Sequence, residues 1–66
     1  MEELINEFVQ ICTEKKLKTY KQVRKTIFDE IWKDYKNKGA QKWRVEAVSD
    51  DLAESVVLRM GISHEA

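Results

Sequence analysis

The chain has 66 residues, of which 42% are apolar, and its twelve acidic side chains balance twelve basic ones. This length leaves room for one domain, residues 1–66, and the single Cys12 excludes an intramolecular disulfide. The apolar content and zero net charge argue against disorder. With no Pro, only two Gly and no long apolar run, we expect a soluble, mostly α-helical, cytoplasmic protein without a membrane span.

The first predicted helix covers about residues 2–16. Its apolar residues repeat at the spacing of one helical face, namely Leu4, Ile5, Phe8, Ile11 and Cys12. Glu2 and Glu3 at its start, and Lys15 and Lys16 at its end, suit the helix dipole. The segment predicts an amphipathic helix and carries no functional signal of its own.

The second predicted helix covers about residues 19–37. Thr19 is a suitable N-cap, and Gln22 three residues later can complete a capping box. The inner face of this helix is formed by Tyr20, Val23, Ile27 and Ile31. Gly39 is the expected C-terminal stop, because glycine tolerates the left-handed conformation needed there.

The third segment has an ambiguous beginning. A helical period runs through Val45, Val48, Leu52, Val56 and Met60. Within residues 42–48, however, apolar and charged side chains alternate as in a strand, and Ser49 before two Asp is a good N-cap. We expect a helix from about residue 45 or 49 to residue 60, with 42–48 left open between helix, loop and strand, and a frayed tail at 61–66.

These elements predict an all-α fold, a small three-helix bundle of about residues 2–16, 19–37 and 45/49–60. A chain this short has little core of its own, so dimerisation is an economical way to complete it. Val57 and Leu58 extend the apolar surface of the third helix beyond a single stripe, whereas a surface helix normally confines it to one. We therefore predict that Val57 and Leu58 contribute to self-association.

The charges are segregated along the chain although they cancel in total. Residues 1–14 carry four acids and no base, residues 15–44 eleven bases and three acids, and residues 45–66 five acids and one base. The corresponding charges are −4, +8 and −4. Two interpretations stay open: the acidic helices neutralise the basic one within the bundle, or the basic middle faces outward toward phosphates or an acidic protein surface.

Within this basic middle, residues 27–44 also hold four of the six aromatic residues. At about 100° per residue, one flank of the second helix combines rings with cations, namely Lys21, Lys25, Phe28, Trp32 and Lys36. Each ring could instead cover a neighbouring helix with lysine stems packed over it. Three short helices offer little area to cover all of them, so we predict a partner-binding surface of these five residues together with Tyr35 and Trp43.

The reactive side chains do not suggest catalysis. His64 is the only histidine and lies in the expected frayed tail, whereas a catalytic base needs a fixed position. Cys12 lies on the inner face of the first helix, where a buried thiol is the ordinary role, and one Cys with one His cannot supply the ligands of a structural zinc. Asp50 and Asp51 fit a helix start better than a cation site. We expect no enzyme activity, metal, cofactor or small-molecule substrate.

The leading hypothesis is a non-catalytic small helical regulator or inhibitor that acts by protein–protein interaction, docking on another protein as a homodimer. Such short charged chains are common among bacteriophage and mobile-element accessory proteins, which is the source we expect on frequency alone. The alternative is nucleic-acid binding by residues 15–44, with rings stacked on bases and cations on phosphates. Residues 49–63 loosely resemble the first helix and turn of a helix-turn-helix unit. Only three residues follow position 63 in this sequence, so we expect no recognition helix there.

Overall fold

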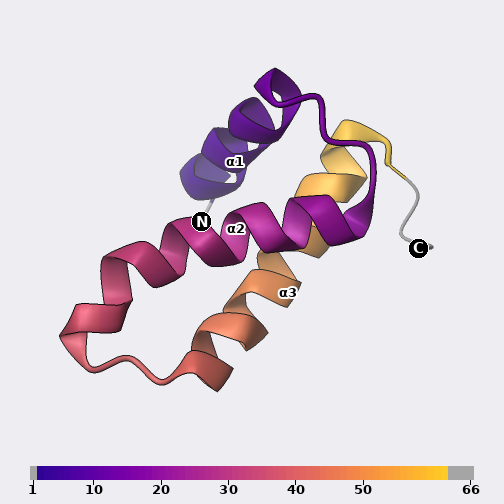
Figure 1. The fold of residues 1–66 in the computed structure, drawn as a ribbon. Helices are drawn as coiled ribbons and strands as arrows, with labels where there is room; N and C mark the ends of the chain where they lie inside the picture. Colours follow the sequence, from indigo (N-terminus) through magenta and orange to yellow (C-terminus); the bar gives the residue numbers. More distant parts are fainter. Residues whose placement is uncertain (1, 63–66) are drawn as a thin grey trace.

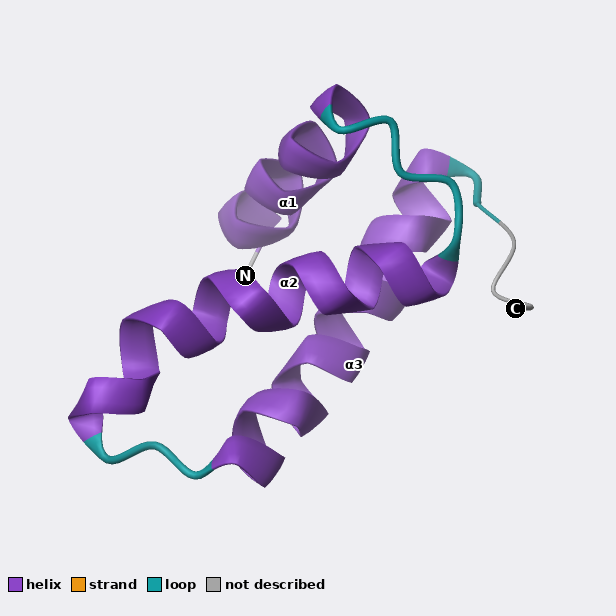
Figure 2. Ribbon diagram, in the orientation of Figure 1, coloured by secondary structure: helices purple, strands orange, loops and turns teal. Residues whose placement is uncertain are grey.

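A computed structural model describes residues 2–62 of the chain, which form three α-helices and a short 3₁₀ segment (Figure 1). The elements are α1 (Glu2–Glu14), α2 (Tyr20–Tyr35), η1 (Lys36–Lys38) and α3 (Lys42–Met60). No strand occurs between residues 2 and 62 (Figure 2). The predicted all-α fold with three helices is confirmed.

The central element of the bundle is α3. It packs most extensively along α2, less extensively against α1, and α1 and α2 contact one another least. Figure 1 shows α2 crossing in front of α3, with α1 above α2 in this view. Near the end of α3, Arg59 donates hydrogen bonds to Asn6 (2.6 Å) and to Glu2, which holds the start of α1 against the end of α3.

The ends of α2 follow the local signals in the sequence. The Thr19 side chain accepts a hydrogen bond from the Gln22 backbone N–H (3.2 Å), and Gln22 accepts one from the Thr19 backbone N–H (3.3 Å). This is the predicted capping box. Gly39 has a φ of 79°, the left-handed conformation expected at the C-terminal stop, and it ends η1 directly after α2.

Both α1 and α3 end in the same hydrogen-bonded turn. At the end of α1, the Leu17 N–H donates to the Cys12 carbonyl (3.1 Å), and Lys16 between them has a φ of 58°. At the end of α3, the Ile62 N–H donates to the Val57 carbonyl (3.0 Å), with Gly61 in the left-handed position. These are Schellman motifs. They stop α1 two residues earlier than predicted and draw Ile62 onto the core, so the expected fraying does not hold for residues 61 and 62; residues 63–66 lie outside the described part of the chain.

The core gathers residues from all three helices. It consists of Phe8, Cys12, Val23, Ile27, Leu52, Ala53, Val56 and Val57. The predicted inner stripes of α1 and α2 supply its first half, with Ile5, Ile11, Tyr20 and Ile31 half-buried around it. Val48 departs from the predicted stripe of α3, because its side chain is 45% exposed. A helix that contacts two neighbours buries a wider and shifted face, which here takes in Ala53 and Val57.

The beginning of α3 corrects the expected N-cap at Ser49. The helix starts at Lys42, after Gln41 in an extended conformation, and Ser49 lies in its middle, fully buried. Of the alternatives left open for residues 42–48, helix is therefore correct. The start signal at Ser49 was local, whereas burial of Val45 at 5% exposure and pairing of Asp50 with α2 favour one continuous helix.

Candidate protein interface

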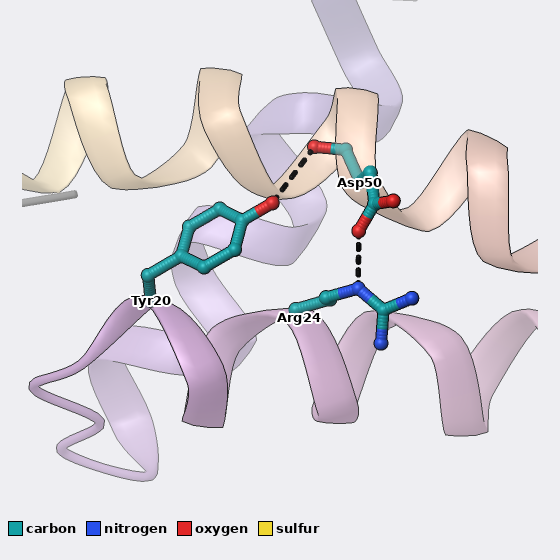
Figure 3. Close-up of polar contacts among 3 residues, drawn as sticks. All are labelled: Tyr20, Arg24 and Asp50. Carbon is teal, nitrogen blue, oxygen red and sulfur yellow. Dashed lines mark hydrogen bonds and ion pairs between the residues drawn. The ribbon is translucent and has the colours of Figure 1, made fainter. Parts of the chain in front are cut away.

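Polar contacts between α2 and α3 set how the two helices face each other (Figure 3). The Tyr20 hydroxyl donates to the backbone carbonyl of Asp50 (3.5 Å), and the Arg24 guanidinium forms an ion pair with the Asp50 carboxylate. The hydrogen bond to Asp50 raises the pKa of Arg24, and burial, followed by the charge of Asp50, raises the pKa of Tyr20. These contacts use the side of α2 that faces α3 and leave the lysines of α2 to solvent.

The predicted flank is a strip of residues one helical turn apart, four of them on α2 and the fifth, Lys36, at the first position of η1. Phe28 and Trp32 stack with ring centroids 6.0 Å apart and an interplanar angle of 17°, and both are half-buried. The rim lysines Lys21, Lys25 and Lys36 are exposed. Lys25 forms an ion pair with Asp29 (3.0 Å), one turn further along the helix. The strip is therefore partly covered by its own chain and partly open.

The other two predicted anchors, Tyr35 and Trp43, lie more openly. Their exposed fractions are 48% and 61%. Each ring has a cation over it at cation–π distance: Lys38 lies 5.4 Å from the Tyr35 centroid, and Arg44 lies 5.4 Å from the Trp43 centroid. The Trp43 indole N–H donates to the side-chain oxygen of Gln41. Trp43 thus lies on the outside of the first turn of α3 with its ring available to a partner.

A groove opens between α1, the C-terminal half of α2 and the middle of α3. Its volume is about 330 Å³. Six apolar or aromatic residues line it, namely Leu4, Phe8, Ile11, Ile31, Tyr35 and Val48. Three acids complete the lining: Glu7, Glu30 and Asp34. Leu4, Tyr35 and Val48 are three of the five large apolar or aromatic side chains most exposed in the described chain, so the groove concentrates uncovered apolar surface inside an acidic rim.

Of the groove residues, only Tyr35 was in the predicted interface. Leu4 and Val48 follow the helical periods of their own helices, which is why the sequence placed them in the core. Their exposure arises because α1 contacts α2 only slightly. How two helices are placed relative to each other cannot be predicted from the periodicity within either one. The weak signal that was present is the pair Glu30 and Asp34 on the flank of α2 opposite its lysines.

The two residues predicted for self-association separate. Val57 is a core residue, only 1% exposed, whereas Leu58 is 80% exposed. Both line a second, smaller hollow of about 290 Å³ with Glu54 and Ile62. Of the two predicted residues, only Leu58 therefore has its apolar side chain open to solvent.

The basic segment is neutralised only slightly within the bundle. Two ion pairs join different helices in the described part of the chain, Arg24 with Asp50 and Arg59 with Glu2. Lys25 and Lys33 pair with acids of α2 itself. The other eight bases of residues 15–44 form no ion pair with a described residue. Most of the +8 charge consequently faces solvent.

No group of three His, Cys, Asp or Glu residues within 2–62 could hold a metal ion, and no helix there has the length and hydrophobicity needed to cross a membrane. Cys12 is fully buried, and burial raises the pKa of its thiol, which keeps it protonated. His64 lies outside the described residues.

Comparison of the chain with protein-family models, with curated proteins and with solved structures found no match.

Proposed function

We propose that the chain is a non-catalytic interaction protein, a small helical regulator or inhibitor that docks another protein surface in the acidic-rimmed groove. One observation carries this proposal: Leu4, Tyr35 and Val48 are exposed together, in one concave surface. Concave apolar surfaces with a few polar groups at the edge are the usual form of a binding site. A protein interface in turn places an aromatic or aliphatic anchor at its centre and polar groups around it.

The negative charge on the rim determines which kind of side chain binds favourably in the groove. Glu7 and Asp34 form no ion pair with any described residue, and Glu30 is paired only with the exposed Lys33, at 3.6 Å. Carboxylates around an apolar floor favour an apolar or aromatic side chain flanked by lysine or arginine and disfavour one flanked by acids. The proposed ligand is therefore a cationic, aromatic-bearing protein segment.

A pair of short peptides tests this proposal. One carries Trp between two pairs of Lys, and the other carries Trp between two pairs of Glu. We expect the Lys peptide, with a Kd on the order of 1 mM, to shift the methyl resonances of Leu4 and Val48 in an NMR titration, and the Glu peptide to shift neither. Leu58, which lies outside the groove, is the internal control.

The titration is done on the Trp43→Ala variant. Trp43 is exposed and has Arg44 beside its ring, so it has the chemistry of the proposed ligand, and its removal prevents one copy of the chain from competing for the groove of another. Absence of any shift at Leu4 and Val48 with the Lys peptide would contradict a docking role for the groove. Equal shifts with both peptides would contradict the role of the acidic rim.

Nucleic-acid binding remains the second candidate because of one observation. Lys36, Lys38, Lys42 and Arg44 form no ion pair with a described residue and lie within seven positions of the exposed Trp43 in the sequence, with Arg44 at 5.4 Å from its ring centroid. Cations beside an exposed ring can hold phosphates while the ring stacks on a base. This function predicts an affinity for single strands that falls steeply with added salt. A fluorescence titration at low salt in which no strand binds would remove it.

A further inference from the structure

We propose that the groove receives Trp43 of a second copy of this chain, so that two copies form a symmetric dimer by exchanging their Trp43 side chains. This inference rests on the proposed docking role of the groove and names its occupant. The occupant is defined as the basic knob, which is Trp43 together with Lys36, Lys38, Lys42 and Arg44. The groove and the basic knob belong to the same molecule and match each other in charge, in shape and in position.

The charges of the two surfaces are complementary. Between residues 36 and 44 the chain has four bases and no acid. The groove is lined by three acids and no base. Since none of the four bases forms an ion pair with a described residue, they are available to the carboxylates of a partner groove. The formal net charge of zero adds no repulsion between two whole copies.

The sizes also match. Trp43 is 61% exposed, the largest side chain among the exposed apolar and aromatic residues of the described chain. The groove volume, about 330 Å³, is at the lower end of the range for ligand pockets, which suits one large side chain better than a whole helix. Tryptophan is the residue type most often found as an energetic anchor in such a position.

The positions of the two surfaces allow both contacts to form in one closed pair. The groove includes Tyr35 at the end of α2 and Val48 of α3, and Trp43 lies in the first turn of α3. Figure 1 shows that the end of α2 and the start of α3 lie at the same end of the molecule. A two-fold axis at this end lets each copy give its basic knob and receive that of the other.

The surface area that Trp43 can bury favours a dimer with two reciprocal contacts over a dimer with one. A buried Trp covers about 150–250 Å². One such contact, counted on both partners, falls well below the total of about 1,000 Å² that a specific interface needs, whereas two reciprocal contacts with their flanking side chains approach it. The exposed Leu58 lies at the other end of α3, so it takes no part in this pair.

The first experiment measures mass by light scattering coupled to size exclusion at about 100 μM chain and low salt. The wild-type chain is expected at twice 7.8 kDa. Trp43→Ala is expected to raise the dimer Kd at least tenfold, and Leu58→Ala, which truncates an even more exposed apolar side chain outside the groove, is expected to leave it unchanged. Helicity by circular dichroism confirms that both variants fold.

Charge exchange identifies the two surfaces that meet. The double variant Glu7→Lys with Asp34→Lys changes the formal charge of the rim from −3 to +1, and Lys42→Glu with Arg44→Glu reverses the two charges on either side of Trp43 in the sequence. Each double variant alone is expected to lose the dimer, because the charges beside Trp43 and the charges introduced or kept at positions 7 and 34 then have the same sign. An equimolar mixture is expected to regain it, since both contacts in the mixed dimer pair opposite charges.

Three results would overturn the inference: a wild-type monomer of 7.8 kDa under these conditions, a dimer indifferent to Trp43→Ala, or a mixture that fails to associate. The proposed function is judged separately. If the chain is monomeric but the Lys peptide still shifts Leu4 and Val48, the groove binds another protein and only the self-association is wrong. If neither occurs, both are wrong.

Discussion

Ser49 is the fully buried polar side chain of the described core, and its hydroxyl has no hydrogen-bond partner. A buried hydroxyl without a partner costs about 1–3 kcal/mol relative to one that is satisfied. The residue sits in the middle of α3, where serine is also a poorer helix former than alanine. Its place in the core therefore reduces the stability of the fold.

We expect Ser49→Ala to raise the free energy of unfolding by about 0.5–1.5 kcal/mol. The substitution removes one oxygen and leaves almost no cavity, so little packing is lost. Urea unfolding followed by circular dichroism measures the change. The control is Ala47→Ser, the reverse substitution at an exposed position of the same helix, which is expected to lower stability only through the poorer helix propensity of serine. A loss of stability in Ser49→Ala would mean that the hydroxyl does have a partner.

At the scale of the element, α1 and α3 end in the same motif with different residues at its left-handed position. Lys16 occupies it with φ 58° and Gly61 with φ 75°. A left-handed backbone costs a residue with a Cβ about 1–2 kcal/mol, and glycine nothing. The end of α1 is therefore strained where the end of α3 is not.

We expect Lys16→Gly to stabilise the protein by about 0.5–1 kcal/mol, the relief of strain being partly offset by the greater freedom of glycine in the unfolded chain. Gly61→Ala is the matched reverse change and is expected to destabilise by about 1 kcal/mol. A Cβ at Gly61 would meet no atom within 4 Å, so its cost comes from the backbone alone. Thermal unfolding of both variants measures the effects, and a destabilised Lys16→Gly would contradict the strain.

How far the sequence predicts an element depends on how local its determinants are. The start and stop of α2 were predictable because Thr19, Gln22 and Gly39 act within one turn of themselves. The start of α3 was not, because the continuation of the helix past Ser49 depends on contacts with residues about 25 positions away, such as Arg24 with Asp50. The flank of lysines and rings on α2 follows from helical periodicity alone, and the stacking of Phe28 on Trp32, one turn apart, agrees with that period.

The groove belongs to the scale of the whole molecule, and this is why the sequence did not predict it. Its walls come from three helices, and its existence depends on the angle between α1 and α2. Each wall residue taken alone has an ordinary explanation: Leu4 and Val48 as core, Glu7 as a solvated acid. Only the assembled bundle distinguishes an apolar residue that is covered from one that is left open at a junction.

Burial within the assembled bundle also makes the stability of the fold decrease at alkaline pH. Burial raises the pKa of the Cys12 thiol, and burial with the charge of Asp50 raises the pKa of the Tyr20 hydroxyl. Below pH 9.0, the ordinary pKa of a thiol, Cys12 is protonated in both the folded and the unfolded chain. As the pH rises past this value, the unfolded chain releases the proton while the folded chain keeps it, so stability falls until the raised pKa of the folded state is passed.

We expect the free energy of unfolding of the wild type to fall more steeply between pH 8 and pH 10 than that of Cys12→Ala, because the unfolded chain releases the thiol proton in this range before the folded chain does. Cys12→Ala is less stable at pH 8 because it leaves a cavity, so the slope with pH is compared and not the absolute value. Tyr20→Phe is the matched control, because it removes the other raised group and leaves the thiol in place. Equal slopes for the wild type and Cys12→Ala would show that Cys12 reaches solvent in the folded chain, which alkylation of the thiol at pH 8 would then detect.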